Sequence, residues 1–169
     1  MNLTQKYYLK SLTYSKTRFI LELTFSSLVI KFILAFIMGV IAFKLNIEKR
    51  LLHQDFGNPF NQSNYIYLIP FFVLIIPSLE TLIQWLPIKL LKKITNNYLA
   101  ILLTTALIFS LMHISRGIFE SILIFPSGLA LSWSFYCKYK ISFREAFFDT
   151  FIIHSLHNII AILFIIYTT

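Results

Sequence analysis

Long apolar stretches constrain this chain more than any other feature. The 169 residues are 57% hydrophobic and only 13% charged, with a mean hydropathy of +0.74. A soluble domain carries about a quarter charged residues, whereas a run of roughly 20 apolar residues can cross a bilayer as a helix. The sequence therefore predicts an all-α integral membrane protein embedded in a lipid bilayer.

The apolar runs predict about five transmembrane helices, separated by polar loops, at 19–43, 65–91, 98–115, 118–136 and 145–167. We expect a polytopic helix bundle with two parts. Residues 1–64 hold a cytoplasmic segment, the first helix and a polar loop. Residues 65–169 hold a four-helix core.

Prolines interrupt two of these helices. Because proline lacks an amide hydrogen, Pro70 and Pro77 predict a bend in the second helix. Pro126 and Gly128 predict a break or bend in the fourth.

The charge pattern predicts how the chain sits in the membrane. Its net charge is +8, from 15 basic and 7 acidic residues. Basic residues concentrate in 1–18, 89–93 and 138–144, which fall on one side, and are sparser at 44–50 and Arg116 on the other. The positive-inside rule then predicts a cytoplasmic N-terminus in the plasma or inner membrane.

The spread of these charges argues against nucleic-acid binding, because no basic helix with interleaved aromatics is present. Cys137, the single cysteine, excludes an intrachain disulfide and a thiolate zinc site.

Four polar residues lie within the apolar runs: Glu80, His113, His154 and Asn158. Such groups are costly at membrane depth and usually face the protein interior, where they mark functional sites. His154 and Asn158 are four apart and share a helix face. Glu80 and His154 lie at similar depths, and helix tilt can absorb the deeper position of His113. We therefore expect the four side chains to converge on one pocket.

These residue types suit hydrolysis. A glutamate in a low-dielectric site can act as general base on a water molecule. His113 would help to position that water, and His154 with Asn158 would stabilise the tetrahedral oxyanion. In the alternative, Glu80, His113 and His154 ligate a zinc ion, with water in the fourth position. Ser155, next to His154, is expected to face away from this site.

The order and spacing of these residues resemble the CAAX-protease and bacteriocin-processing (CPBP, or Abi) family of intramembrane proteases. That family carries E-E-x-x-x-R, then F-x-x-x-H, then H-x-x-x-N or H-x-x-x-D. The second pattern fits Phe109 to His113, and the third fits His154 to Asn158. The resemblance covers roughly 65–167. It implies an intramembrane endopeptidase that acts on a membrane protein or peptide substrate.

The first motif departs from the family pattern. A proline often precedes the family's first glutamate by three residues, so Pro77 places Glu80 there, with Thr81 at the second glutamate and Trp85 at the arginine. The other alignment puts Gln84 at the arginine and Glu80 at the second glutamate. In either alignment one carboxylate and the arginine are absent.

Two other functions also fit the sequence. One is a non-catalytic bacteriocin-immunity or interaction protein on the same scaffold. The other is a small proton- or metal-coupled transporter that uses the buried groups. Asp149, near a helix end, is expected to be solvated.

Overall fold

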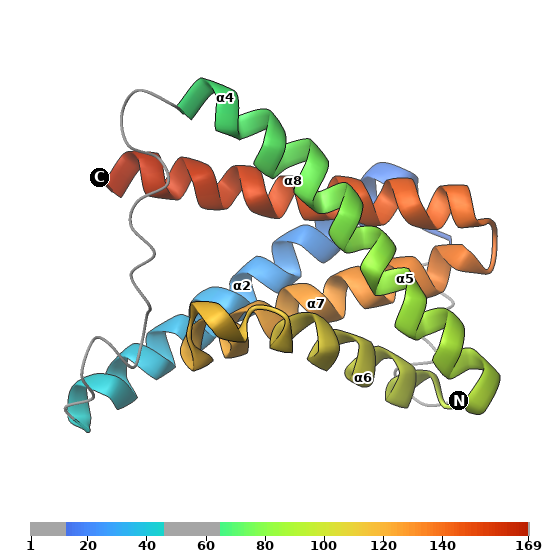
Figure 1. The fold of residues 1–169 in the computed structure, drawn as a ribbon, viewed down its shortest axis with the longest axis horizontal. Helices are drawn as coiled ribbons and strands as arrows, with labels where there is room; N and C mark the ends of the chain where they lie inside the picture. The colour runs from blue at the N-terminus through green and yellow to red at the C-terminus, as the bar shows by residue number, and fades with distance from the viewer. Residues whose placement is uncertain (1–12, 46–64, 169) are drawn as a thin grey trace.

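The computed structural model describes residues 13–45 and 65–168, and within them every regular element is a helix (Figure 1). The expected all-α polytopic bundle is thus confirmed. The elements are α2 (Lys16–Lys44), α4 (Tyr65–Pro70), the π-helical segment η1 (Phe71–Ile75), α5 (Ile76–Ile94), α6 (Tyr98–Leu111), the 3₁₀ turn η2 (Ile114–Arg116), α7 (Ile118–Tyr139) and α8 (Phe143–Thr168).

Among the described residues, four helical runs are long and apolar enough to cross a membrane: Lys16–Lys44, Leu68–Ile94, Ile118–Tyr139 and Phe143–Phe164. The predicted third helix is shorter than expected. α6 has 14 residues, which at about 1.5 Å each span roughly 21 Å, less than the hydrocarbon thickness. The bundle thus has four potential spans and one shorter apolar helix.

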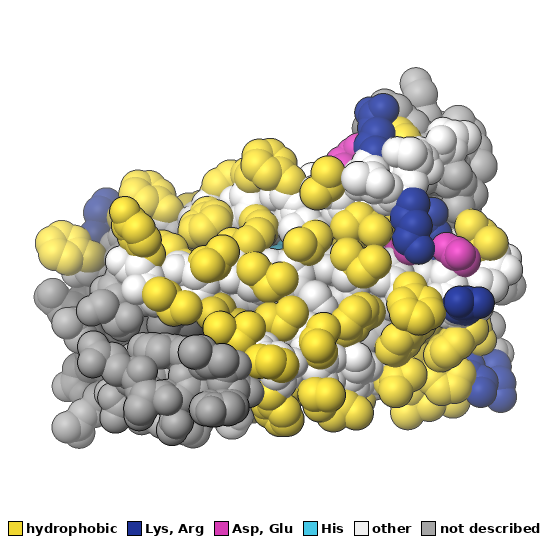
Figure 2. Space-filling model, turned by 90° about the horizontal axis from the view of Figure 1, so that it is seen from above, with side chains coloured by type: hydrophobic (Ala, Val, Ile, Leu, Met, Phe, Trp, Pro, Cys, Tyr) yellow, Lys and Arg dark blue, Asp and Glu magenta, His cyan; other side chains and the backbone are white. Residues whose placement is uncertain are grey.

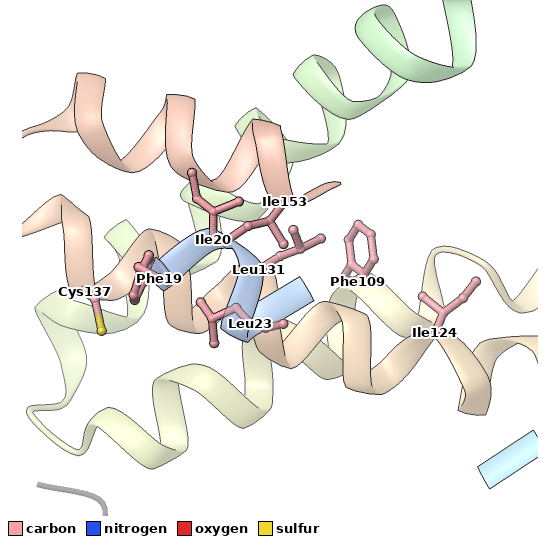
Figure 3. Packing of buried hydrophobic residues seen from close by; sticks show 9 residues of the cluster. Phe19, Ile20, Leu23, Phe109, Ile124, Leu131, Cys137 and Ile153 are labelled. Carbon is pink, nitrogen blue, oxygen red and sulfur yellow. The ribbon is translucent and has the colours of Figure 1, made fainter. Parts of the chain in front are cut away.

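α7 is the central helix and packs against α2, α5, α6 and α8. A core of buried side chains joins α2, α6, α7 and α8 (Figure 3): Phe19, Ile20, Leu23, Phe109, Ile124, Ala130, Leu131, Cys137 and Ile153. Much of the outer surface is apolar instead, with Phe25, Phe32 and Phe36 of α2 exposed. Figure 2 shows one such face, where yellow side chains cover the middle and charged ones lie toward the ends. This distribution suits a lipid-facing surface.

Small and hydroxylated residues bring α6 and α7 together, as is usual where lipid removes the hydrophobic driving force between helices. Ser110 and Ser121 each donate a hydrogen bond to the other's backbone carbonyl. The connection between the helices turns at Gly117, whose φ of 118° is accessible mainly to glycine. α6 therefore ends at Leu111, rather than near residue 115 as predicted.

The prolines act differently in the two helices. After Pro70 the chain forms the π-helical turn of η1, so the second predicted helix is continuous but locally distorted. Pro126 lies inside α7, which runs unbroken from Ile118 to Tyr139; no break occurs there.

Asp149 is not solvated, and that prediction was wrong. Its side chain is fully buried, with the Lys16 Nζ 2.8 Å from Oδ1 and the Lys138 Nζ 3.8 Å from Oδ2. Lys138 is itself buried. Asp149 is buried because the first turn of α2 packs over α7 and α8, so three helices meet at a charged cluster.

Candidate functional site

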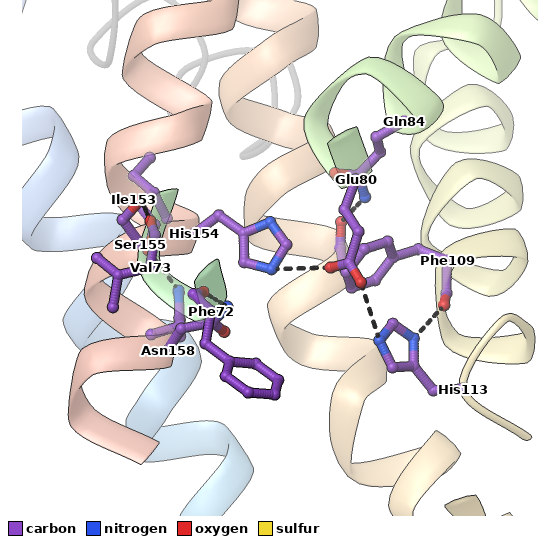
Figure 4. A network of polar contacts seen from close by, with 12 residues as sticks. Phe72, Val73, Glu80, Gln84, Phe109, His113, Ile153, His154, Ser155 and Asn158 are labelled. Carbon is purple, nitrogen blue, oxygen red and sulfur yellow. Dashed lines mark hydrogen bonds and ion pairs between the residues drawn. The ribbon is translucent and has the colours of Figure 1, made fainter. Parts of the chain in front are cut away.

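Glu80 lies on α5, between two histidines from other parts of the chain (Figure 4). Its Oε2 is 3.1 Å from the His154 Nε2 of α8, and its Oε1 is 3.7 Å from the His113 Nε2. The glutamate side chain is 18% exposed, against 9% for His113 and 7% for His154. Three of the four expected site residues therefore meet, although their catalytic roles stay predictions.

His113 follows the end of α6 and is held by its own backbone. Its Nδ1 lies 2.9 Å from the carbonyl oxygen of Phe109. A carbonyl can only accept, so Nδ1 carries a proton and donates it to this hydrogen bond. The other ring nitrogen, Nε2, faces Glu80 Oε1, and their 3.7 Å separation is too long for a direct hydrogen bond.

His154 makes the shorter contact with the carboxylate. At 3.1 Å its Nε2 is within hydrogen-bond distance of Oε2, and the carboxylate oxygen accepts a hydrogen bond from the ring N–H. The other ring nitrogen, Nδ1, is buried and has no hydrogen-bond partner in the described structure. His154 therefore fixes one oxygen of Glu80 and leaves Oε1 available.

Phe109 packs against both histidines. Its ring centroid is 5.0 Å from that of His113 and 5.7 Å from that of His154. Gly128 of α7 makes room for it, because a Cβ there would meet Phe109 Cδ1 and Ala106 O, each at 3.1 Å. Nothing in the sequence indicated the contribution of Gly128.

Asn158 does not contact Glu80 or His113. Its Nδ2 donates to the Phe72 carbonyl of η1 at 2.8 Å, one helical turn along α8 from His154. Ser155, expected to face elsewhere, donates from Oγ to the Val73 carbonyl at 2.7 Å. Any direct role of Asn158 in oxyanion binding would have to use its second amide hydrogen.

The positions aligned with the family's second glutamate and arginine carry neutral side chains, of which Thr81 and Gln84 are buried and Trp85 is half-buried. Thr81 is fully buried, and the side chain of Gln84 donates to the Gly128 carbonyl and to Ser132 Oγ. Trp85 packs edge-to-face against Phe143. Sequence reasoning missed the hydrogen bonds of Gln84, although its four-residue spacing from Glu80 placed both on one helix face.

His157 belongs to a different contact. Its Nδ1 donates to the Ile153 carbonyl, and its Nε2 is hydrogen-bonded to Ser27 Oγ of α2. This pair joins α8 to α2. Of the two histidines in the H-x-x-H-N pattern, only His154 meets the glutamate.

The zinc alternative uses the same three side chains. Glu80, His113 and His154 are suitable zinc donors by type. Within residues 13–45 and 65–168, however, no group of three His, Cys, Asp or Glu side chains is arranged to hold a metal ion. Each histidine Nε2 faces its own carboxylate oxygen rather than a shared point.

Comparisons with protein-family models, with curated proteins and with solved structures found no match to this chain.

Proposed function

We propose that this protein is an intramembrane endopeptidase of the CAAX-protease-like family, in which Glu80 activates water. The observation that carries the proposal is the meeting of Glu80, His113 and His154 inside an apolar bundle. Three ionisable groups from three helical segments, each costly at membrane depth, are brought to one point. They come from all three motif segments of the family resemblance, in its order.

The proposed mechanism begins with a water between Glu80 Oε1 and His113 Nε2. In this mechanism the His113 ring is neutral, so both atoms accept hydrogen bonds, and their 3.7 Å separation allows one water to donate to both. The water's oxygen lone pair then faces the substrate carbonyl. As the water oxygen bonds to the carbonyl carbon, a water O–H bond breaks and the proton passes to Glu80.

The second half of the reaction returns that proton. Negative charge develops on the carbonyl oxygen, and the N–H of His154 Nε2 can donate to it once Glu80 is protonated. The C–N bond then breaks, and Glu80 gives its proton to the departing amine. The products are a carboxylic acid and an amine, and the site returns to its starting state.

The surroundings of the site favour a substrate that reaches it from the membrane. Leu79, Ile83 and Met112, close in sequence to Glu80 and His113, are exposed apolar residues. An apolar or lipid-modified peptide could approach this surface without leaving the lipid. The charge pattern supports a cytoplasmic N-terminus for the same protein.

A non-catalytic immunity or interaction protein is the second candidate. The observation that favours it is the set of neutral side chains at Thr81, Gln84 and Trp85, where the family resemblance would place a second carboxylate and an arginine. In that case Glu80 and the histidines would be a structural polar contact, and their chemistry would not matter to function.

Catalysis by Glu80 predicts that Glu80→Gln abolishes cleavage and that His113→Ala reduces it by roughly 10²-fold or more, since a positioned general base contributes about 10²–10⁴-fold. The measurement uses purified protein in lipid vesicles with quenched fluorescent peptides, one a farnesylated peptide ending in a CAAX box and others purely apolar. Glu22→Gln is the matched control, because Glu22 lies on α2 and pairs with Arg18.

Two outcomes separate the candidates. Full cleavage by purified Glu80→Gln would overturn the protease proposal. If no peptide is cleaved and Glu80→Gln protects cells from a bacteriocin as well as the parent protein does, the interaction function is favoured. Ion flux into the same vesicles without peptide would instead indicate the transporter. Inhibition of peptide cleavage by a chelator, reversed by added zinc, would support the metal alternative.

A further inference from the structure

Pro77 leaves part of the helix backbone without a donor. It is buried three residues before Glu80 and has no amide hydrogen. In an α-helix, the amide at position 77 would donate to Val73 O; in the π pattern it would donate to Phe72 O. The π pattern is present one residue earlier, where the Ile76 amide donates to Phe71 O. At membrane depth no bulk water can satisfy these carbonyls.

α8 supplies donors to these same two carbonyls. Ser155 Oγ binds Val73 O at 2.7 Å, and Asn158 Nδ2 binds Phe72 O at 2.8 Å. The two donors are three residues apart and so lie on one face of α8. His154 directly precedes Ser155 on the same helix. The backbone gap made by Pro77 is therefore filled next to the histidine that holds Glu80.

We propose that Ser155 and Asn158 are positioning residues that fix η1 and α5 against α8, so that the Glu80 carboxylate stays opposite His154. Glu80 follows Pro77 by less than one helical turn, so a shift of η1 along α8 would move the carboxylate from its 3.1 Å contact. The kinetic part of this inference rests on the proposed function; the structural part does not.

The test is a double-mutant cycle with Pro77→Ala, which restores an amide hydrogen to the gap. Ser155→Ala and Asn158→Ala should each lower the unfolding midpoint in detergent by several degrees, because a buried carbonyl loses its donor. They should also lower kcat by roughly tenfold with little change in KM, as expected when a catalytic base is misplaced. In the Pro77→Ala background, at least one of these losses should shrink to roughly twofold or less.

A readout independent of cleavage follows the ring of His154. NMR of ¹⁵N-histidine-labelled protein should show changed chemical shifts of the His154 ring nitrogens in Ser155→Ala and in Asn158→Ala. Ser155→Thr, which keeps the hydroxyl, should keep the parent chemical shifts. Ser78→Ala is the matched control, since Ser78 Oγ also binds a carbonyl of this stretch, Leu74 O, but within its own helix.

The outcomes are separable. The positioning role is overturned if the losses simply add to the effect of Pro77→Ala. It is also overturned if the His154 ring-nitrogen chemical shifts change as little in Ser155→Ala and Asn158→Ala as in Ser78→Ala. A kcat loss in Asn158→Ala that Pro77→Ala leaves intact would instead make Asn158 an oxyanion donor. If Pro77→Ala does not fold, the positioning role is judged from Ser155→Thr and Ser155→Ala. Behaviour of Ser155→Thr like the parent and a loss in Ser155→Ala support the role, and equal losses in both contradict it. If no variant or parent cleaves peptide, the proposed function fails while the melting and NMR results still test the positioning role.

Discussion

Gly128 shows how a single missing side chain shapes the site. A Cβ at this position would lie 3.1 Å from both Ala106 O and the Phe109 ring, closer than an ordinary van der Waals contact. The Phe109 ring in turn packs against His113 and His154. Gly128 takes no part in the chemistry, yet it allows Phe109 to pack where it contacts both histidines.

Gly128→Ala is expected to lower the unfolding midpoint and to reduce peptide cleavage by displacing Phe109. The clash opposes the gain of about 1 kcal/mol that Ala has over Gly in a helix. Thermal unfolding in detergent and the vesicle cleavage assay measure the two effects. Gly39→Ala is the matched control, because nothing lies within 4 Å of a Cβ there, so it should be neutral or stabilising. Equal behaviour of the two variants would contradict this role for Gly128.

At the scale of elements, the charged cluster at Asp149 attaches α2 to the rest of the bundle. α2 begins after the N-cap Ser15, and Lys16 in its first turn reaches Asp149 of α8, beside Lys138 of α7. Much of the remaining surface of α2 is exposed and apolar. Since lipid provides no hydrophobic force between helices, such a polar contact matters more here than in a water-soluble bundle.

Asp149→Asn is expected to destabilise the protein by roughly 3–5 kcal/mol, the range for removing one partner of a buried ion pair, because the buried Lys138 loses its counter-charge. Glu145→Gln is the control: Glu145 is 47% exposed and 3.7 Å from Lys16, so its loss should cost about 0–1 kcal/mol. Chemical unfolding in mixed micelles measures both. An Asp149→Asn midpoint as high as that of Glu145→Gln would show that the cluster does not hold α2.

For the whole molecule, the helices run so that Lys16 and the basic turn between α7 and α8 share one end. Lys16, at the start of α2, touches Asp149 and Glu145 near the start of α8, beside the turn that carries Lys140. Arg116 lies at the other end of α7, a helix of 22 residues that spans about 33 Å. The predicted orientation places the Lys140 end in the cytoplasm.

Cysteine labelling tests this orientation. Cys137 is buried, so Cys137→Ser provides a background without reactive thiols, into which Lys140→Cys or Arg116→Cys is introduced. In intact cells an impermeant maleimide should label position 116 and leave position 140 unlabelled until the membrane is opened. Labelling of position 140 from outside would reverse the orientation.

The sequence by itself predicted the helices, apart from the length of α6, and three of the four polar residues expected to meet. Apolar length predicts membrane helices, because the bilayer admits few other structures. The cost of placing Glu80, His113 and His154 in hydrocarbon indicated that they would meet, and the structure brings them together. Both inferences depend on the type and order of residues, which are local properties.

The tertiary structure decided what each of the remaining polar groups contacts. Asn158 binds Phe72 O instead of sharing the pocket of Glu80, and Asp149 is buried because α2 folds over it. α6 stops at Leu111. The chain then turns at Gly117 into α7, and the Ser110–Ser121 pair holds the two helices together. These features depend on which helix packs beside which, and residue spacing along one helix carries no information about its neighbours.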